Sequence, residues 1–280
     1  LWPNTFYAKQ AEYRQLWATP LPLRFGRLLY FSLGGPEAGW RGISGAHLLL
    51  LPGLLLAAGR ALMPEERRGR PAALLALAWA VAHVFLYAWR LPVTYQHGRY
   101  LWPAVPIFIL FGLRGWLSLS SLVAGRLAAR PRLRFYWRGL TRLTFLALLV
   151  VFLLLGAQSF AQDVAFINGE MVAAAEWLAR STPAASLVAA HDIGAIGYFG
   201  RRPILDLAGL ITPQVIPHMD DQADLAGYIT AAGADYLVTA PGWPYEGVLV
   251  ALPSEQLYSA GYAWTRQQGL NNTAVYALGP

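Results

Sequence analysis

Four long apolar runs dominate the first 160 residues of the chain, at about 43–62, 72–89, 100–122 and 143–160. A helix needs about 20 apolar residues to cross a bilayer, because each residue adds roughly 1.5 Å to its length. The last run, LTFLALLVVFLLLGAQSF, contains no charged residue and is rich in Leu, Val and Phe. The pattern therefore predicts four transmembrane helices.

Some of these runs contain an ionisable residue. Arg114 interrupts the third run, and we interpret it as lying near one end, where its side chain reaches the headgroups. His83 lies in the middle of the second run. An ionisable group there is either functional or hydrogen-bonded to a neighbouring helix, and we favour the hydrogen bond because neutral imidazole is less costly in lipid than a charge. The same two explanations apply to His47.

From residue 161 onward the pattern changes to short apolar runs separated by turn residues. This pattern is typical of a small folded α/β domain, and the segment is long enough to bury its own core. The first expected elements are a helix that continues from the fourth run almost to Pro183, a strand at 186–190, a glycine-rich turn at 191–200, and a strand with a turn at 203–210. They are followed by a helix near 221–232, a strand at 235–240, and a final pair of strands near 262–267 and 273–278.

The composition agrees with this division. Hydrophobic residues make up 56% of the chain and charged residues only 13%, which argues against a soluble globule. The absence of Cys excludes disulfides, thiolate metal sites and cysteine nucleophiles. We predict a polytopic α-helical membrane protein with a small C-terminal α/β domain. Its parts are an interfacial segment at 1–42, a transmembrane domain at 43–160 and an extracytoplasmic domain at 161–280.

Charge differs sharply between the two halves of the chain. Residues 1–160 carry 18 Lys and Arg against 4 Asp and Glu, whereas residues 161–280 carry 4 against 11. The basic residues lie between apolar runs, so membrane topology explains them better than nucleic-acid binding does. The first 20 residues lack the pattern of a signal peptide, and we interpret the sequence as beginning within a longer protein.

Arginines in the connectors predict the orientation. The segments 63–71 and 124–142 are rich in arginine and should face the cytoplasm. Alternation then places residues 1–42, the loop 90–99 and the C-terminal domain on the outer side. Within the first segment, LPLRFGRLLYFSL at 21–33 suits a helix that lies in the membrane interface.

The outer loop before the third run carries the strongest candidates for anion binding. Arg99 and His97 lie on the side where arginine is not expected to accumulate. A guanidinium donates paired hydrogen bonds to a phosphate, although it can equally anchor the chain to lipid headgroups. Tyr100 fits an aromatic interfacial belt. Lys9, the only lysine, is a weaker candidate because it can pair with Glu12 three residues later.

Several motifs in the C-terminal domain have both a structural and a functional explanation. Gly194, Gly197 and Gly200 give GxxGxxG rather than the GxGxxG of a dinucleotide site, which favours helix packing. Asp192 precedes a helical turn that it can cap, and Asp206 ends a strand. Either carboxylate is a possible contact for a sugar hydroxyl. The cluster of His218, Asp220, Asp221 and Asp224 suggests a metal, but an acid-rich helix N-terminus also explains it.

The chain resembles the C-terminal half of a bacterial GT-C glycosyltransferase. The resemblance is based on NTFYAK (4–9), YQHGRYLWPAVP (95–106), HDIGAIGYFG (191–200) and ILDLAGL (204–210), and it spans nearly all 280 residues. It is nearest to the mannosyl- and arabinofuranosyltransferase-like branch. Enzymes of this kind are polytopic and use polyprenyl-phosphate sugars.

This resemblance implies a function. The chain would transfer a sugar from a polyprenyl-phosphate donor to a cell-envelope glycan, lipid or protein acceptor on the outer face of the bacterial cytoplasmic membrane. It implies lipid-phosphate binding by Arg99 and Tyr100, and it places the catalytic carboxylate upstream of Leu1. His97 and Lys9 are weaker candidates for binding the lipid phosphate, from their charge and position alone. No cofactor is implied, and a divalent cation is left open. Membrane lipids are expected partners and nucleic acid is not.

Two other functions remain open at the level of the sequence. A non-catalytic, membrane-anchored protein that binds or assembles extracytoplasmic glycans has the same outline. A transporter is less well supported, because the apolar runs lack paired acidic residues and broken helices. An acidic residue in an upstream outer loop would favour transfer over binding.

Overall fold

The computed structural model of the protein describes residues 3–33, 49–63, 70–94, 98–240 and 245–279. The chain divides into two compact units, one of Leu1–Arg14 with Phe160–Pro280 and one of Gln15–Ser159. The sequence pattern groups residues 1–42 together, whereas the structure divides them. Residues up to Arg14 join the C-terminal domain because Ala8 and Ala11 of α1 (Asn4–Glu12) are buried in that unit.

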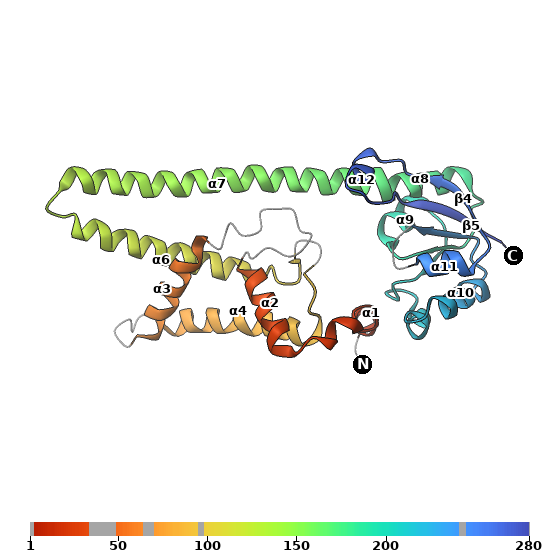
Figure 1. Cartoon of the computed structure of the whole chain (residues 1–280), viewed down its shortest axis with the longest axis horizontal. Coiled ribbons are helices and arrows are strands. Elements are labelled where there is room, and N and C mark those ends of the chain that lie inside the picture. The colour runs from red at the N-terminus through yellow and green to blue at the C-terminus, as the bar shows by residue number, and fades with distance from the viewer. Residues whose placement is uncertain (1–2, 34–48, 64–69, 95–97, 241–244, 280) are drawn as a thin grey trace. The chain divides into compact units, whose positions relative to one another are not determined.

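The unit of Gln15–Ser159 is helical. Its elements are the 3₁₀ helix η1 (Arg14–Ala18), α2 (Leu21–Ser32), α3 (Leu51–Leu62), α4 (Arg70–Arg90), α6 (Val105–Arg126) and most of α7 (Pro131–Ile167). Among the described residues, three helical stretches are long and apolar enough to cross a membrane: Pro71–Arg90, Val105–Arg126 and Pro131–Ser181. Figure 1 shows α7 as one uninterrupted helix. None of its residues is buried, so its apolar surface suits a lipid environment.

The predicted spans agree with these helices to different extents. The second and fourth spans lie within described helices, as predicted. The described helix of the first span has 12 residues, and positions 43–48, including His47, lie outside the described residues. The third span begins later than predicted. Residues 99–104 form turns, because Pro103 disfavours a helical conformation at the residue before it.

The arginine-rich segment 124–142 is not an open connector. Only residues 127–130 separate α6 from α7, which begins at Pro131. Proline is favoured in the first turn of a helix and arginine is a good helix former, so most of the segment continues as helix. The predicted position of Arg114 near one end of its span is also wrong. It lies nine residues after the start of α6, on a groove of about 700 Å³ that is also lined by Arg60 of α3.

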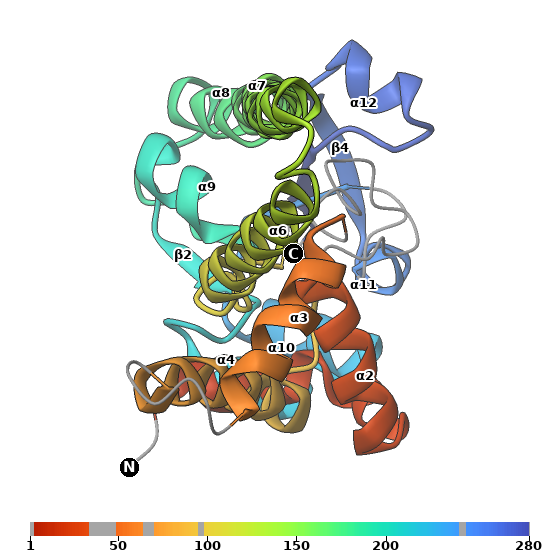
Figure 2. The same ribbon diagram turned by 90° about the vertical axis from the view of Figure 1, so that its left-hand side faces the viewer.

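Glycines allow α3 and α6 to approach each other closely (Figure 2). A Cβ at Gly115 would lie 1.7 Å from the carbonyl oxygen of Gly53, and one at Gly53 would lie 2.1 Å from that of Gly112. Nearby, the indole of Trp116 donates a hydrogen bond of 2.7 Å to the carbonyl of Leu49. Small residues at such a crossing are typical of helices that pack within membranes.

The C-terminal domain contains a mixed five-stranded sheet. Its strands are β1 (Val188–Ala190), β2 (Ile204–Asp206), β3 (Tyr236–Thr239), β4 (Ser254–Ser259) and β5 (Ala274–Leu278). Their order is β2-β1-β3-β5-β4, and the first three strands are parallel while β5 is antiparallel to both of its neighbours. The predicted strands at 186–190, 235–240 and 273–278 are confirmed, and the strand and turn predicted at 203–210 are β2 and the turn that follows it.

Helices cover both faces of this sheet (Figure 1). Alternate strand residues explain the two layers: Val188 and Val238 face one core, and Ala189 and Leu237 face the other. The first core includes α8 (Ala173–Ser181) and α9 (Ile193–Gly200). The second includes the 3₁₀ helix η4 (Pro213–His218), α10 (Gln222–Ala231) and α11 (Glu246–Ala251).

Two local predictions in this domain are wrong. The segment 191–200, predicted as a glycine-rich turn, is mostly the helix α9, and residues 262–267 form the helix α12 (Ala263–Gln267) instead of a strand. On its outer side β5 pairs with the edge strand β4, which the hydrophobic pattern misses because nearly all of the β4 side chains are exposed. The predicted helix near 221–232 is confirmed as α10.

A buried carboxylate lies where the long helix enters the domain. Between α7 and α8 the chain forms one π-helical turn, η3 (Asn168–Val172), which contains Glu170. The Glu170 side chain accepts hydrogen bonds from the hydroxyl of Thr265, the amide of Asn272 and the backbone N–H of Thr273. The helix is thereby attached to the segment around α12 and β5.

Candidate functional site

The loop between α4 and α6 holds the Arg99–Tyr100 pair. The Arg99 guanidinium donates a hydrogen bond of 3.1 Å to the Tyr100 hydroxyl and lies 5.0 Å from the centre of its ring. The Tyr100 ring stacks on Tyr87 of α4 at 5.6 Å. Tyr100 therefore limits the orientations of a guanidinium whose side chain is exposed.

His83 holds the same loop from α4. Its Nε2 lies 2.9 Å from the carbonyl oxygen of Tyr100, and its ring stacks on Trp79. The structure therefore agrees with the interpretation of His83 as a hydrogen-bonded residue. The partner is a backbone carbonyl in the turn before α6, not a group on a helix.

The Arg99 loop joins the ends of α4 and α6 that are distant from the arginine-rich segments. At the other ends of these helices lie Arg70 and Arg126. Arg99 and Tyr100 are therefore at the helix ends that the sequence assigns to the outer side. His97 lies outside the described residues, so its predicted role in lipid-phosphate binding has no structural description.

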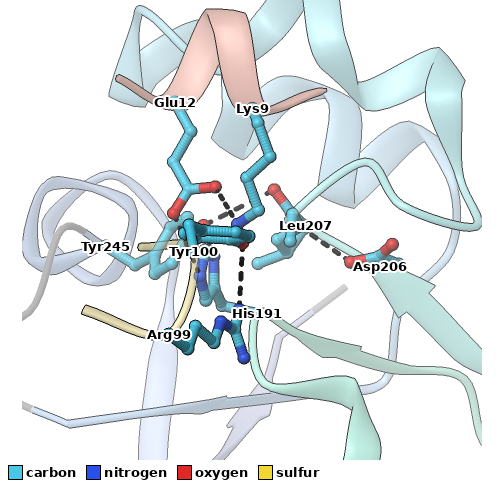
Figure 3. A network of polar contacts seen from close by, with 9 residues as sticks. Lys9, Glu12, Arg99, Tyr100, His191, Asp206, Leu207 and Tyr245 are labelled. Atoms are coloured by element: carbon cyan, nitrogen blue, oxygen red, sulfur yellow. Dashed lines mark hydrogen bonds and ion pairs between the residues drawn. The ribbon is translucent and has the colours of Figure 1, made fainter. Parts of the chain in front are cut away.

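A second polar cluster lies within the unit of the C-terminal domain. In α1, Lys9 donates a 2.5 Å hydrogen bond to Glu12, which is the i,i+3 pair considered from the sequence. The other carboxylate oxygen of Glu12 lies 3.8 Å from Nε2 of His191, which follows β1. Figure 3 shows these side chains pointing toward one another. A lysine that is paired with a carboxylate is less available to a phosphate.

Tyr245 completes the surroundings of His191. Its hydroxyl lies 2.6 Å from Nδ1 of His191 and 3.4 Å from the carbonyl oxygen of Leu207 (Figure 3). Burial raises the pKa of the Tyr245 hydroxyl, so it keeps its proton at neutral pH. Because a phenol carries one proton, the Tyr245 hydroxyl donates either to Nδ1 of His191 or to the carbonyl oxygen of Leu207.

Asp192 and Asp206 have different environments. Asp192 occupies the N-cap position of α9, as expected, but its side chain accepts no capping hydrogen bond from that helix. Burial raises the pKa of the Asp192 carboxyl; His191 and Lys9 oppose the shift, and Glu12 reinforces it. Asp206 is fully buried and accepts hydrogen bonds from the N–H groups of Ala208 and Ile211. The structure therefore gives Asp206 a role in the turn after β2.

Comparison with known proteins matches a segment of the C-terminal domain to a family model. Residues 161–276 match a family model described as a domain of unknown function (DUF8728). No curated protein and no solved structure matches the chain. The matched segment lies within the unit that contains the sheet and the His191 cluster.

The cluster of His218, Asp220, Asp221 and Asp224, at the end of η4 and the start of α10, is explained by contacts with neighbouring protein groups. Asp221 caps α10 by accepting hydrogen bonds from the N–H groups of Ala223 and Asp224. The Asp224 carboxylate lies 2.8 Å from Nδ1 of His218, and Asp220 pairs with Arg14. Within the described ranges, no group of three or more His, Asp or Glu side chains is arranged to hold a metal ion.

The glycine motif of 191–200 lies in α9, whose neighbours include α8 and β2. A Cβ at Gly200 would lie 3.6 Å from the carbonyl oxygen of Ala175 in α8, and one at Gly197 would lie 3.5 Å from Ile204 in β2. These are ordinary van der Waals distances, and a Cβ at Gly194 would meet nothing within 4 Å. The packing of α9 therefore leaves room for a Cβ at all three positions, and the helix-packing explanation of GxxGxxG stays a prediction.

Sequence reasoning does not single out Glu12, His191 or Tyr245 as a group. His191 has a local signal, because it follows a buried parallel strand next to Asp192. Glu12 is noticed only as the partner of Lys9. Tyr245 has no signal in the sequence, since it meets His191 through a separation of 54 residues.

Proposed function

We propose that this chain is part of a polytopic membrane glycosyltransferase that takes its sugar from a polyprenyl-phosphate carrier. The Arg99–Tyr100 pair carries this proposal. It combines an exposed guanidinium, oriented by an aromatic ring and a hydroxyl, with a position at the ends of two apolar helices. Such a group meets a lipid phosphate at the depth where the headgroup lies.

The sidedness proposed for the chain fits this donor. An enzyme that acts on the outer face of the bacterial cytoplasmic membrane has no supply of cytosolic nucleotide sugars. An activated sugar then has to arrive on a lipid carrier within the same membrane. The acceptor is a glycan, lipid or protein of the cell envelope that reaches this face.

The proposed reaction is a displacement at the anomeric carbon. A carboxylate takes the proton of an acceptor hydroxyl, the hydroxyl oxygen bonds to the anomeric carbon, and the bond from that carbon to the phosphate oxygen breaks. Negative charge develops on the departing lipid phosphate, where Arg99 stabilises it. Among the residues of this chain, Arg99 is the one to which we give a direct role.

The test is transfer from a defined polyprenyl-phosphate sugar by the full-length protein in proteoliposomes. Arg99→Ala should lower the rate by about 10² or more while leaving membrane insertion unchanged. Arg99→Lys should retain part of the activity, because lysine keeps the charge but not the planar fork. Arg138→Ala, which removes an exposed arginine of α7, is the matched control and should be as active as the wild type.

Unchanged transfer by Arg99→Ala would remove this residue from the site. Absence of transfer by the wild type with every polyprenyl-phosphate donor would favour the second function, a non-catalytic protein that binds or assembles extracytoplasmic glycans.

A further inference from the structure

A small cavity opens at the carboxyl ends of two parallel strands in the C-terminal domain. Its volume is about 100 Å³. Ala190, His191 and Asp192 line it where β1 ends, and Thr239 and Ala240 line it where β3 ends. Ligands of α/β domains commonly bind at this edge of a parallel sheet, where successive strands present side chains to the same space.

Thr239 gives this cavity an unsatisfied polar group. Its residue is only 6% exposed, and its hydroxyl has no hydrogen-bond partner among the described residues. Buried hydroxyls are nearly always hydrogen-bonded, because leaving one unpaired away from water is costly. A ligand group in the cavity would supply the missing partner.

Asp192 adds a carboxyl group at the same cavity. It lies at the N-terminus of α9 but does not cap that helix, so this usual structural explanation for an N-cap aspartate is absent. Glu170, which also lines the cavity, already accepts three hydrogen bonds from neighbouring protein groups. The cavity therefore has a hydroxyl and a carboxyl group as its main unassigned polar features.

The remaining lining selects against an anionic ligand. Among the described lining residues there is no Lys or Arg, so an anionic group would meet two carboxyl groups without a compensating cation. Phe166 and Leu270 supply apolar surface suited to the C–H groups of a sugar. The volume holds about three water molecules at roughly 30 Å³ each, so it fits one edge of a sugar and not a whole oligosaccharide.

We propose that this cavity binds a neutral, hydroxyl-bearing group, such as the hydroxymethyl edge of a sugar, through the Thr239 hydroxyl and the Asp192 carboxyl group. Hydroxyl groups both donate and accept, so one such group pairs with the threonine and an adjacent one donates to the carboxyl oxygen. The site lies within the C-terminal domain and does not depend on the transferase activity proposed above.

The experiment is ligand-observed NMR on the whole chain in detergent micelles, with methyl α-D-mannopyranoside and methyl α-D-glucopyranoside as probes. Saturation transfer to the hydroxymethyl protons of at least one glycoside is expected. Thr239→Val keeps the shape of the side chain, and it should weaken binding of that glycoside about fivefold by removing one hydrogen bond. Asp192→Asn should also weaken it.

Thr230→Val is the matched control, since the Thr230 hydroxyl donates to a carbonyl of its own helix. It should bind the glycoside like the wild type. Thermal melting without probe shows whether Thr239→Val still folds, and its melting temperature should equal or exceed that of the wild type because an unpaired buried hydroxyl is removed. The proposal is overturned if neither glycoside shows saturation transfer, if Thr239→Val binds as the wild type does, or if ethanolamine or inorganic phosphate displaces the bound glycoside.

Discussion

The amide of Asn272 donates a hydrogen bond of 2.6 Å to the buried carboxylate of Glu170, across 102 residues of sequence. The same carboxylate accepts from Thr265 and Thr273. Because every neighbour is a donor, Glu170→Gln would turn an amide N–H₂ toward at least one of them. We expect this variant to lose about 2 kcal/mol or more of stability.

Thermal and denaturant unfolding of the whole chain in detergent measures this effect. Glu255→Gln, on the exposed edge strand β4, is the control and should stay within about 0.5 kcal/mol of the wild type. Equal stability of the two variants would show that the Glu170 contacts do not hold the helix to the domain.

The raised pKa of the Asp192 carboxyl group predicts that the stability of the folded protein depends on pH. Its pKa in the folded protein is raised above the ordinary value of 3.8, chiefly by burial. A raised pKa means that ionisation disfavours the folded state. The contribution of the protonated Asp192 carboxyl group to folding stability is therefore complete below about pH 3.8. It is lost as the pH rises through the higher pKa that this group has in the folded protein.

Asp192→Asn removes this titration. The melting temperature of the variant minus that of the wild type should become more positive as the pH rises from 3.8 to the higher pKa of Asp192 in the folded protein. The titratable neighbours of Asp192 that remain in both proteins are His191, Glu12 and Lys9. A difference that is constant with pH would contradict a raised pKa.

The glycine crossing of α3 and α6 predicts a strong effect of a single methyl group. Gly115→Ala places a Cβ against the backbone of Gly53, so the helices would have to separate. Gly125→Ala, in the same helix, meets nothing within 4 Å. Thermal stability in detergent should fall for the first variant and stay the same or rise slightly for the second, and equal melting curves would exclude a tight crossing.

Several features of the structure can be predicted from local patterns in the sequence. Lys9 and Glu12 are three residues apart and form the expected pair, and Asp221 precedes α10 and caps it. The parallel strands β1 and β3 are short apolar runs that were predicted from composition. These features depend on neighbours in the sequence or on complete burial.

Features that depend on distant contacts were missed. The polar edge strand β4 has no hydrophobic alternation, and α9 contains three glycines that locally favour a turn. Glu170 and Tyr245 acquire partners only when segments 50 to 100 residues apart meet. The sequence could therefore indicate the neighbourhood of His191 and Asp192 but not the side chains that surround them.

The functional proposals for Arg99 all depend on the side of the membrane to which the chain's loops and C-terminal domain are assigned. Labelling of intact cells tests this assignment directly. The 280 residues contain no cysteine, so single cysteines can be introduced at exposed positions of this chain. Ser254→Cys in β4 should react with a membrane-impermeant maleimide, and Ala129→Cys between α6 and α7 should react only after the membrane is opened. The opposite pattern would place the C-terminal domain in the cytoplasm and contradict glycosyl transfer from an outward-facing lipid carrier.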